Sequence, residues 1–269
     1  MTEAVGSLTK RPLCLNLLLQ MHRTLMDGVR GQDRGRGKFR QVQNWIGRSD
    51  STLKTAKFVP PDPVVMQESL SNWEKYLHIE EPDRLVQLAV IHAQFEIIHP
   101  FTDGNGRLGR MLVPLFLSEC KLLSSPMFYL SAYLERHRAT YYERLHGITA
   151  AGEWNEWVSF FLTAIIEQAQ ENYSKAKDIL TLYEEMKGRI PKIIASEYSI
   201  QTLDALFVRP IFNTSEFASR TGMPKRTAQR ILKSLLEQNV LAMQQEARGI
   251  TPSTLRFAPL LEITGDVLD

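Results

Sequence analysis

The sequence predicts a mostly α-helical protein with a large N-terminal domain, residues 1–200, and a small C-terminal domain, residues 201–269. Apolar residues recur at helical spacing along most of the chain, as in LVQLAVIHAQFEII, residues 85–98. Before residue 66, clusters of glycine and proline interrupt this periodicity and predict loops with a short hairpin. The composition shifts near residue 200, where short helices and two short candidate strands follow a long helical pattern. A chain of 269 residues suffices for one large and one small domain.

The overall composition is that of an ordinary globular protein, with 43% hydrophobic and 23% charged residues. A net charge of +2 indicates no bias of the whole chain toward nucleic acids or membranes. No apolar stretch is long enough to span a bilayer, and the N-terminal run KRPLCLNLLLQM lacks the features of a signal peptide. Cys14 and Cys120 lie among leucines and predict two buried thiols rather than a disulfide or metal site. We therefore expect a cytoplasmic protein without a membrane partner.

The first 66 residues predict one helix followed by two irregular segments. Leucine and methionine residues between positions 15 and 26 fall at helical spacing, which predicts an amphipathic helix that ends near DGVRG, residues 27–31. The next segment, RGQDRGRGKFR, is basic, but no aromatic residues alternate with the charges. This pattern favours a solvated loop over a nucleic-acid-binding arm. In TAKFVPPDPVV, residues 55–65, three prolines exclude a helix and predict a loop or short hairpin.

The stretch HPFTDGNGRLGR, residues 99–110, concentrates the reactive side chains of the chain. Pro100 disfavours helical backbone at His99, which places the imidazole where a helix gives way to a loop. The tract Gly104-Asn105-Gly106 allows positive backbone φ angles, so that successive N–H groups can point at one anion. The residues that follow form a helical pattern, and the N-terminus of a helix also attracts anions. The sequence therefore predicts a phosphate site here.

The charged residues of this stretch predict a polyphosphate ligand. Arg107 and Arg110 are three residues apart and lie on one helical face, where both can bind further phosphates. Asp103 would repel a bare phosphate, so its presence makes sense if it binds Mg²⁺ that the phosphates share. His99 is then left as a base that takes a proton from an attacking hydroxyl.

These twelve residues resemble the complete signature of the Fic family, H-P-F-x-[D/E]-G-N-G-R-x-x-R, and every specified position matches. The resemblance extends through KFRQVQNWIG, FVPP, LSAYL, YYERL and EWNEWVSFFL, and covers roughly residues 13–190. It implies a helical core and an enzyme that transfers AMP from ATP to a Ser, Thr or Tyr hydroxyl of a target protein. Pyrophosphate is the second product.

The resemblance also implies a role for each residue of the motif. His99 is the general base, and Asp103 binds the Mg²⁺ that accompanies ATP. The loop residues and the first arginine cradle the α- and β-phosphates, and Arg110 binds the γ-phosphate. The implied nucleotide-binding set comprises Gly104, Asn105, Gly106, Arg107, Leu108, Gly109 and Arg110.

Two further features of the family have counterparts outside the motif. Members carry a flap that aligns the backbone of the target, and TAKFVPPDPVV stands at the matching place. Its extended residues Lys57, Phe58 and Val59 are expected to add a strand to the target segment. Tyr141 and Tyr142 resemble tyrosines that border the adenine, although ordinary core aromatics remain an equal alternative.

Regulation of the activity stays open. Many family members carry an inhibitory helix with the pattern [S/T]-x-x-x-E-[G/N], which has no match in this sequence. Either the chain lacks self-inhibition, or an inhibitor acts in trans, or an N-terminal segment has been removed. Related proteins also remove AMP or transfer other phosphate-linked groups, so both reactions are alternatives to AMP transfer.

The C-terminal domain resembles a winged helix-turn-helix. Residues 212–241 predict a helix capped by Ser215, a turn at Gly222 and a second helix, and residues 241–259 predict two short strands. Residues 217–236 contain five basic residues and no acid, which suits contacts with DNA phosphates. A surface for protein docking or homodimer formation is the alternative. A nucleotide-sensing regulator that binds DNA is therefore a further functional alternative.

Overall fold

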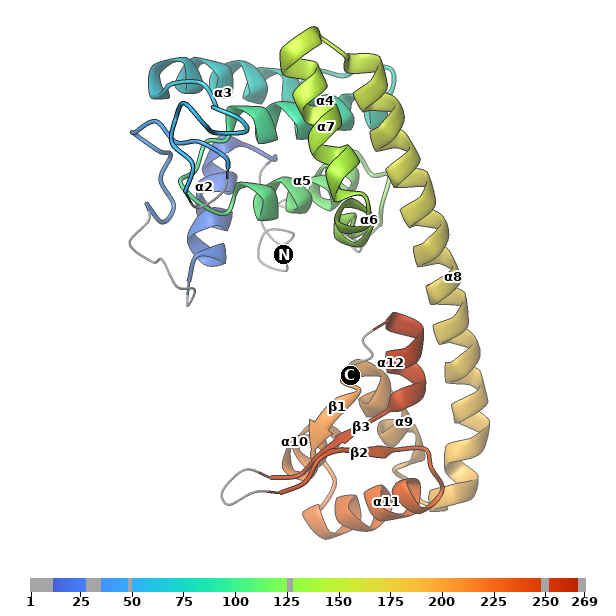
Figure 1. Ribbon diagram of the computed structural model, residues 1–269. Helices are drawn as coiled ribbons and strands as arrows, with labels where there is room; N and C mark the ends of the chain where they lie inside the picture. Colours follow the sequence, from blue (N-terminus) through green and yellow to red (C-terminus); the bar gives the residue numbers. More distant parts are fainter. Residues whose placement is uncertain (1–11, 28–34, 48–49, 125–127, 248–251, 266–269) are drawn as a thin grey trace. The chain divides into compact units, whose positions relative to one another are not determined.

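The computed structural model describes residues 12–27, 35–47, 50–124, 128–247 and 252–265, and these residues are mostly helical (Figure 1). The mostly α fold class expected from the sequence is confirmed. The N-terminal helices are α2 (Leu15–Leu25), α3 (Pro63–Leu77), α4 (Arg84–Ile98), α5 (Asn105–Glu119), α6 (Ser131–Arg136), α7 (Arg138–Ala151) and α8 (Trp154–Ile194). The remaining elements are α9 (Ser199–Val208), β1 (Ile211–Asn213), α10 (Thr214–Thr221), α11 (Lys225–Glu237), β2 (Ala242–Gln245), β3 (Thr254–Arg256) and α12 (Ala258–Thr264).

The chain divides into two compact units, Met1–Gln170 and Glu171–Asp269. The division falls within α8, whereas the change in composition near residue 200 placed it after that helix. The physical reason is the second half of α8, whose apolar residues pack in the core of the C-terminal unit: Leu182, Met186, Ile190 and Ile194. The helical pattern of the sequence runs unbroken through both cores, so it carries no sign of the boundary.

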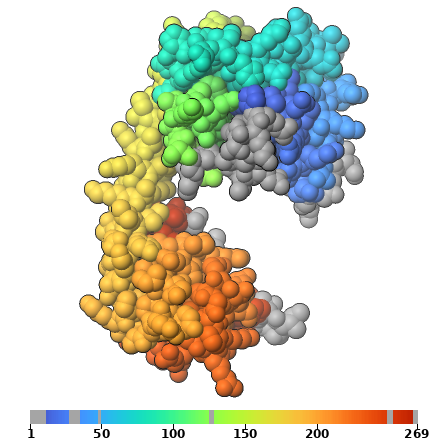
Figure 2. All heavy atoms as spheres, turned by 180° about the vertical axis from the view of Figure 1, so that it is seen from behind, coloured from blue at the N-terminus to red at the C-terminus, as the bar shows by residue number. Residues whose placement is uncertain are grey.

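The core of the first unit is centred on α4. This helix packs against α3 on one side and α5 on the other, and Figure 1 shows the three helices lying side by side. Figure 2 shows the side chains of this layer packed closely together. α4 begins where the Asp83 carboxylate accepts hydrogen bonds from the main-chain N–H groups of Leu85 and Val86, at 2.9 and 3.1 Å. This cap sets the start of the helix whose other end carries His99.

The segment between α2 and α3 contains the expected short hairpin as one antiparallel bridge. Ile46 donates its N–H to the Phe58 carbonyl at 2.8 Å, and Phe58 donates to the Ile46 carbonyl at 3.1 Å. Asp62 then caps α3 through the N–H groups of Val64 and Val65, and Pro63 at the first helical position preorganises that turn. Residues 48–49 in this segment, and residues 28–31 where the first helix was expected to end, lie outside the described residues.

The second unit contains a three-stranded antiparallel sheet in the order β1-β3-β2. The two strands expected after the second helix are β2 and β3, and β1 is an additional strand of three residues that the sequence did not predict. The helix-turn-helix is formed by α10 and α11 around Gly222, whose φ of 69° is in the region that glycine favours. Residues 248–251, including the expected glycine turn, lie outside the described residues.

The cap of α10 differs from the expectation. Asn213, and not Ser215, caps the helix: its side chain accepts hydrogen bonds from the N–H groups of Ser215 and Glu216, each at 3.0 Å. The Glu216 carboxylate accepts the Asn213 N–H at 3.1 Å, which completes a capping box. The short strand β1 places Asn213 at the cap position, two residues earlier than expected.

Two other expectations concern the chain as a whole. Cys14 and Cys120 are free thiols, as predicted, but each is only partly buried. Among the described residues, no helix combines the length and apolar character needed to cross a membrane.

Candidate active site

His99 terminates α4 in a left-handed backbone conformation, with φ 48° and ψ 60°. Its N–H still donates to the Phe95 carbonyl at 3.1 Å, and Pro100 prevents a further helical turn. A non-glycine residue in this region is strained and persists only where its surroundings hold it. The imidazole is partly exposed, but Nδ1 is buried and has no hydrogen-bond partner among the described residues.

The His99 imidazole is neutral at physiological pH. Its pKa is lowered to about 4, mainly by burial and also by the charge of Arg40, whereas the Glu96 carbonyl and the charge of Asp103 act in the opposite direction. A neutral imidazole can accept a proton from a hydroxyl group. His99 therefore rests in the neutral form that a general base requires.

Asn105 holds the loop that follows His99. Its Oδ1 accepts the Phe101 N–H at 2.9 Å, and its Nδ2 donates to the Phe101 carbonyl at 2.7 Å. The Asn105 side chain is buried, with 2% exposure, and is therefore occupied within the protein. Any contribution of Asn105 to a phosphate cradle is left to its main-chain N–H.

The start of α5 supplies N–H groups for an anion. Gly104 caps the helix with φ 84°, a conformation that suits glycine. Its own N–H donates to Asp103 Oδ1 at 2.6 Å. The first N–H groups of any helix have no acceptor in a preceding turn, and here they belong to residues 105–107. Of the tract Gly104-Asn105-Gly106, only Gly104 has a positive φ, and the other two residues already belong to α5, so the N–H groups available to an anion are those of the helix start.

The two arginines of the motif lie beside this helix start. Arg107 Nη2 is 3.8 Å from Asp103 Oδ1, and its side chain is 37% exposed. The Arg110 side chain folds back along the helix toward Gly106. A Cβ atom at Gly106 would lie only 3.3 Å from Arg110 Nη1. The guanidinium of Arg110 therefore lies about one turn nearer the nest than its own backbone.

Asp103 offers one carboxylate rather than a complete metal site. Its side chain is 41% exposed, and its contacts with Gly104 and Arg107 are both made by Oδ1. No cluster of three or more His, Cys, Asp or Glu residues suited to a metal occurs in the part of the chain that the structure describes. A single accessible carboxylate fits Mg²⁺ that takes its other ligands from phosphates and water.

Leu108 and Gly109 face the interior of the protein. Leu108 is fully buried in the core. The Gly109 carbonyl accepts a hydrogen bond from His92 Nδ1 at 3.1 Å, and a Cβ atom at Gly109 would collide with Glu96 Oε1. Burial raises the pKa of Glu96 to about 7, and Arg110 opposes this shift. These two motif residues thus shape the packing between α4 and α5.

The tyrosine pair is divided between core and surface. Tyr141 is 7% exposed, and its hydroxyl donates to His92 Nε2 at 3.0 Å, since Nδ1 of that ring carries the other proton. His92 is fully buried, and both of its ring nitrogens are hydrogen-bonded within the protein. Tyr142 is 50% exposed, with the Arg138 guanidinium 5.9 Å from its ring centre. Adenine binding by the pair stays a prediction.

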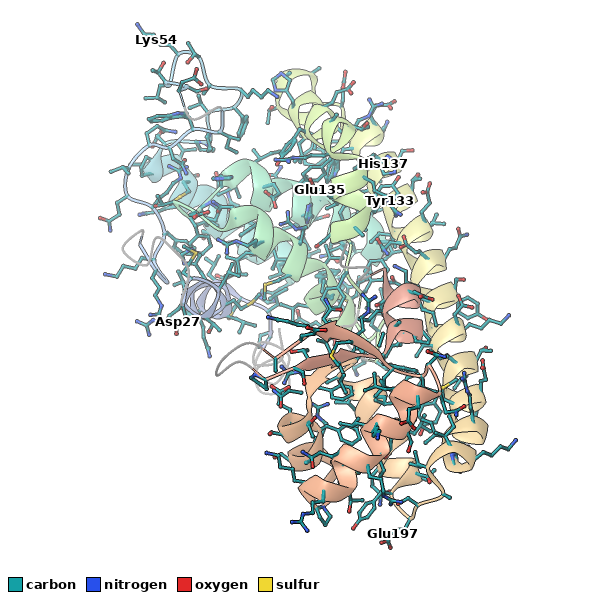
Figure 3. The ribbon with its side chains drawn as sticks, turned by 60° about the horizontal axis from the view of Figure 1, so that its bottom comes forward. Asp27, Lys54, Tyr133, Glu135, His137 and Glu197 are labelled. Carbon is teal, nitrogen blue, oxygen red and sulfur yellow. The ribbon has the colours of Figure 1, made fainter. Side chains whose placement is uncertain are left out.

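The flap residues lie on the edge that carries the single bridge. Lys57 is exposed, Val59 is 43% exposed, and Phe58 between them is partly buried and paired with Ile46. Figure 3 shows Lys54, close to this edge, pointing away from the helices. The alternation of exposed and paired residues is that of a short strand.

Two residues near the motif were not identified from the sequence. His22 of α2 accepts the Gly37 N–H on Nδ1 at 2.8 Å and donates from Nε2 to the Asp103 carbonyl at 3.1 Å. Its ring stacks on Phe101 with 4.0 Å between centroids. The signal available in the sequence was its position at helical spacing from Leu18 and Leu25, on the apolar face.

Arg40 corrects the interpretation of the basic segment as a solvated loop. Its residue is only 3% exposed, and its guanidinium is held by main-chain carbonyls around His99. The physical reason is that several carbonyls converge on one point and together replace the water around the charge. Part of the basic segment, residues 30–34, lies outside the described residues.

Comparison with known proteins shows what the part of the chain around this site is similar to. Residues 12–117 match the model of the Fic/DOC family. A probable protein adenylyltransferase of Aquifex aeolicus is 41% identical over 78 residues, 29% of this chain and 24% of that protein. The protein adenylyltransferase fic-1 of Caenorhabditis elegans is 31% identical over 103 residues, 37% of this chain and 18% of that protein. The chain therefore spans a quarter or less of the length of these two relatives.

The fold has a counterpart among solved structures. The crystal structure of a Fic family protein from Desulfovibrio desulfuricans G20 matches with a TM-score of 0.57, covering 95% of this chain and 72% of that chain. At 19% sequence identity this match shows the shared fold alone. The family match over residues 12–117 includes the motif and the helices α4 and α5 on either side of it. Residues 12–117 are therefore similar to the Fic/DOC family, and the fold is similar to that of a Fic family protein.

Proposed function

We propose that this protein is a protein adenylyltransferase, which transfers AMP from ATP to a Ser, Thr or Tyr hydroxyl of a target protein. The observation that carries the proposal is the placement of a neutral His99 imidazole one short loop before the anion-binding start of α5. A base and an anion-binding helix start that are joined by one short loop suit the attack of a hydroxyl on a bound phosphate. The names of the Aquifex and Caenorhabditis relatives support the same reaction.

The mechanism assigns one task to each group. The N–H groups of residues 105–107 and the guanidinium of Arg107 bind the α- and β-phosphates, and Arg110 binds the γ-phosphate. His99 accepts the proton of the target hydroxyl as its oxygen forms a bond to the α-phosphorus. The bond from that phosphorus to the bridging oxygen breaks, and pyrophosphate leaves. Asp103 would hold Mg²⁺, which neutralises part of the phosphate charge when bound.

The flap supplies the target's position in this proposal. Lys57, Phe58 and Val59 would pair with an extended segment of the target through main-chain hydrogen bonds, which select for backbone more than for side chains. Inhibition in trans, a homodimer and a cytoplasmic location are further parts of the proposal, and the inhibitory pattern missing from the sequence motivates the first of these.

The experiment that tests the reaction uses ATP labelled at two positions. The protein is incubated with cell extract and Mg²⁺, with ³²P either at the α- or at the γ-phosphate. We expect protein labelling from the α position alone, and loss of the labelling when EDTA removes the metal. Labelling from the γ position would instead show phosphoryl transfer. Release of label from a target that already carries AMP, without any new labelling, would show the reverse reaction.

A second candidate function rests on the exposed face of α11. The buried side of this helix is apolar, whereas four basic side chains lie exposed on the other side: Lys225, Arg226, Arg230 and Lys233. Of these, Lys233 is 3.8 Å from the Glu237 carboxylate. We infer that the C-terminal unit is a winged helix whose α11 contacts DNA phosphates.

The salt dependence of binding tests this second function. Replacing both Arg226 and Arg230 with glutamine removes two phosphate contacts, so the slope of log affinity against log salt should become shallower by about 2. Fluorescence anisotropy with a labelled duplex, between about 50 and 200 mM salt, measures the slope. The control is Lys192→Gln on α8, which should leave it unchanged. Equal slopes for all three proteins would favour protein docking or dimer formation.

A further inference from the structure

Arg40 is a buried arginine that connects the flap segment to the end of α4. Its donors reach four main-chain carbonyls: Nε donates to His99 at 3.0 Å, Nη1 to Val42 at 3.3 Å, and Nη2 to Ile98 at 3.4 Å and to Pro61. Two of these acceptors belong to the end of α4, and two belong to the segment that contains the bridge. The Arg40 guanidinium thus connects the end of α4 with the segment that contains the bridge.

Neighbouring contacts strengthen the same connection. The Arg40 N–H donates to the Pro100 carbonyl at 2.9 Å, and Asn44 Nδ2 donates to the Phe101 carbonyl at 3.3 Å. Gln43 Nε2 donates to the Pro60 carbonyl at 2.8 Å. Residues 40–44 therefore contact both the loop that follows His99 and the prolines that directly follow the flap residues 57–59.

The chemistry of this contact is specific to arginine. Burial lowers the pKa of Arg40, and the charge of Asp62 is the opposing influence. A buried charge is unfavourable unless hydrogen bonds replace its water, and here four neutral carbonyls do so. Only a planar guanidinium has enough donors in fixed directions to serve four separate acceptors. An apolar side chain would fill the same volume without orienting either segment.

The hydrogen bonds of Arg40 restrain the backbone of His99. His99 has a strained left-handed backbone, and its carbonyl is one of the four acceptors. The direction of the imidazole follows from this backbone conformation. The flap, which would hold the target, is fixed through Pro61 by the same guanidinium.

We propose that Arg40 is a positioning residue for AMP transfer, which holds the His99 backbone and the flap as one unit. The base then stands at a fixed distance from a hydroxyl on a segment docked along Lys57–Val59. This inference rests on the proposed function for its catalytic part. The structural part, that Arg40 restrains the flap, is independent of any activity.

The catalytic part is tested with two variants and a matched control. Arg40→Lys keeps the charge but cannot serve four acceptors, and Arg40→Met removes the charge at similar length. The control is Arg36→Met, because Arg36 is partly exposed and bonds to the Arg23 carbonyl at 2.9 Å and to Asp27 at 2.8 Å. We expect both Arg40 variants to lower kcat about 100-fold, since small displacements of a reacting group have effects of this size. The Kd for ATP should change less than about twofold.

The structural part is tested by amide hydrogen exchange on the protein without nucleotide or target. The N–H groups of Ile46 and Phe58, which form the bridge, should exchange about tenfold faster in both Arg40 variants. Amides in the middle of α5 should keep their rates, and so should all of these amides in Arg36→Met. Transfer rates are expressed per ATP-binding site counted by calorimetry, so that unfolded protein does not imitate a loss of kcat.

The possible outcomes distinguish the effect of Arg40 on catalysis from its effect on the flap. Loss of kcat together with faster bridge exchange, at constant ATP affinity, supports the proposal. Equal losses of kcat and ATP affinity, or bridge exchange that does not change, would overturn it. If the unmutated protein transfers no AMP, the proposed function fails, whereas the exchange experiment still decides whether Arg40 holds the flap.

Discussion

Replacing His99 with alanine is expected to lower AMP transfer by about 10²–10⁴-fold, the usual contribution of a positioned base. The affinity for ATP should hardly change, because the imidazole acts on the target hydroxyl and makes little contact with the bound nucleotide. Radiolabel transfer from α-labelled ATP measures the first quantity, and calorimetric titration with ATP measures the second. His137, which is exposed and labelled in Figure 3, provides the matched control as His137→Ala.

The pH dependence of transfer gives an independent check on His99. Its pKa of about 4 lies well below the ordinary value of 6.5. The active form is the neutral imidazole, so activity is lost only as the pH falls toward the lowered pKa. Between pH 7.5 and 5.5 the kcat/KM should therefore stay nearly constant, whereas a base of ordinary pKa would lose about tenfold. A decline with a midpoint near 6.5 would contradict the lowered pKa of His99, and a parallel loss of ATP affinity in His99→Ala would contradict its role as the base.

Replacing Asn105 with alanine is expected to destabilise the first unit by about 2–4 kcal/mol. The substitution removes two hydrogen bonds and leaves the N–H and carbonyl of Phe101 without their partner in a buried site. An unsatisfied buried polar group costs about 1–3 kcal/mol. Urea unfolding of the whole chain measures the change, which should appear in the transition of the first unit and not of the second.

The control for Asn105 lies in the same loop. Thr102 is exposed, so Thr102→Ala should change the free energy of unfolding by less than about 0.5 kcal/mol. A similarly small effect for Asn105→Ala would mean that the loop keeps its shape without this side chain. Asn105 would then be available to a ligand, as the motif alone had implied.

The backbone conformation of the motif is a feature that the sequence can predict. Backbone properties follow from residue type: Pro100 ends a helix, Gly104 accepts a positive φ, and the N-terminus of a helix attracts anions wherever it occurs. The end of α4 at His99 and a helix close after it could therefore be predicted from local order alone, although α5 begins at Asn105, within the tract that was expected to form a loop. These features bring His99 close to the start of α5, which is the basis of the proposed active site.

Side-chain assignments that depend on distant partners could not be predicted in this way. From its sequence context, the Asn105 side chain could bind a phosphate or hold the loop in place. Only its hydrogen bonds to the main chain of Phe101 decide between the two. The sequence likewise does not show that Tyr141 is buried and hydrogen-bonded to His92, a residue 49 positions away. Which of two segments meets a side chain is a property of packing, and it leaves no local pattern.

By itself, the sequence determined the mostly helical fold, the helix-to-loop junction at His99, a helix start close after it and the helix-turn-helix of the second unit, because each depends on residues close together in the chain. Only the tertiary structure decided that α8 is shared between two cores and that Arg40 is buried. Both follow from long-range packing: apolar residues at helical spacing look alike in any core, and an arginine can be buried only where carbonyls from several segments converge to replace its water.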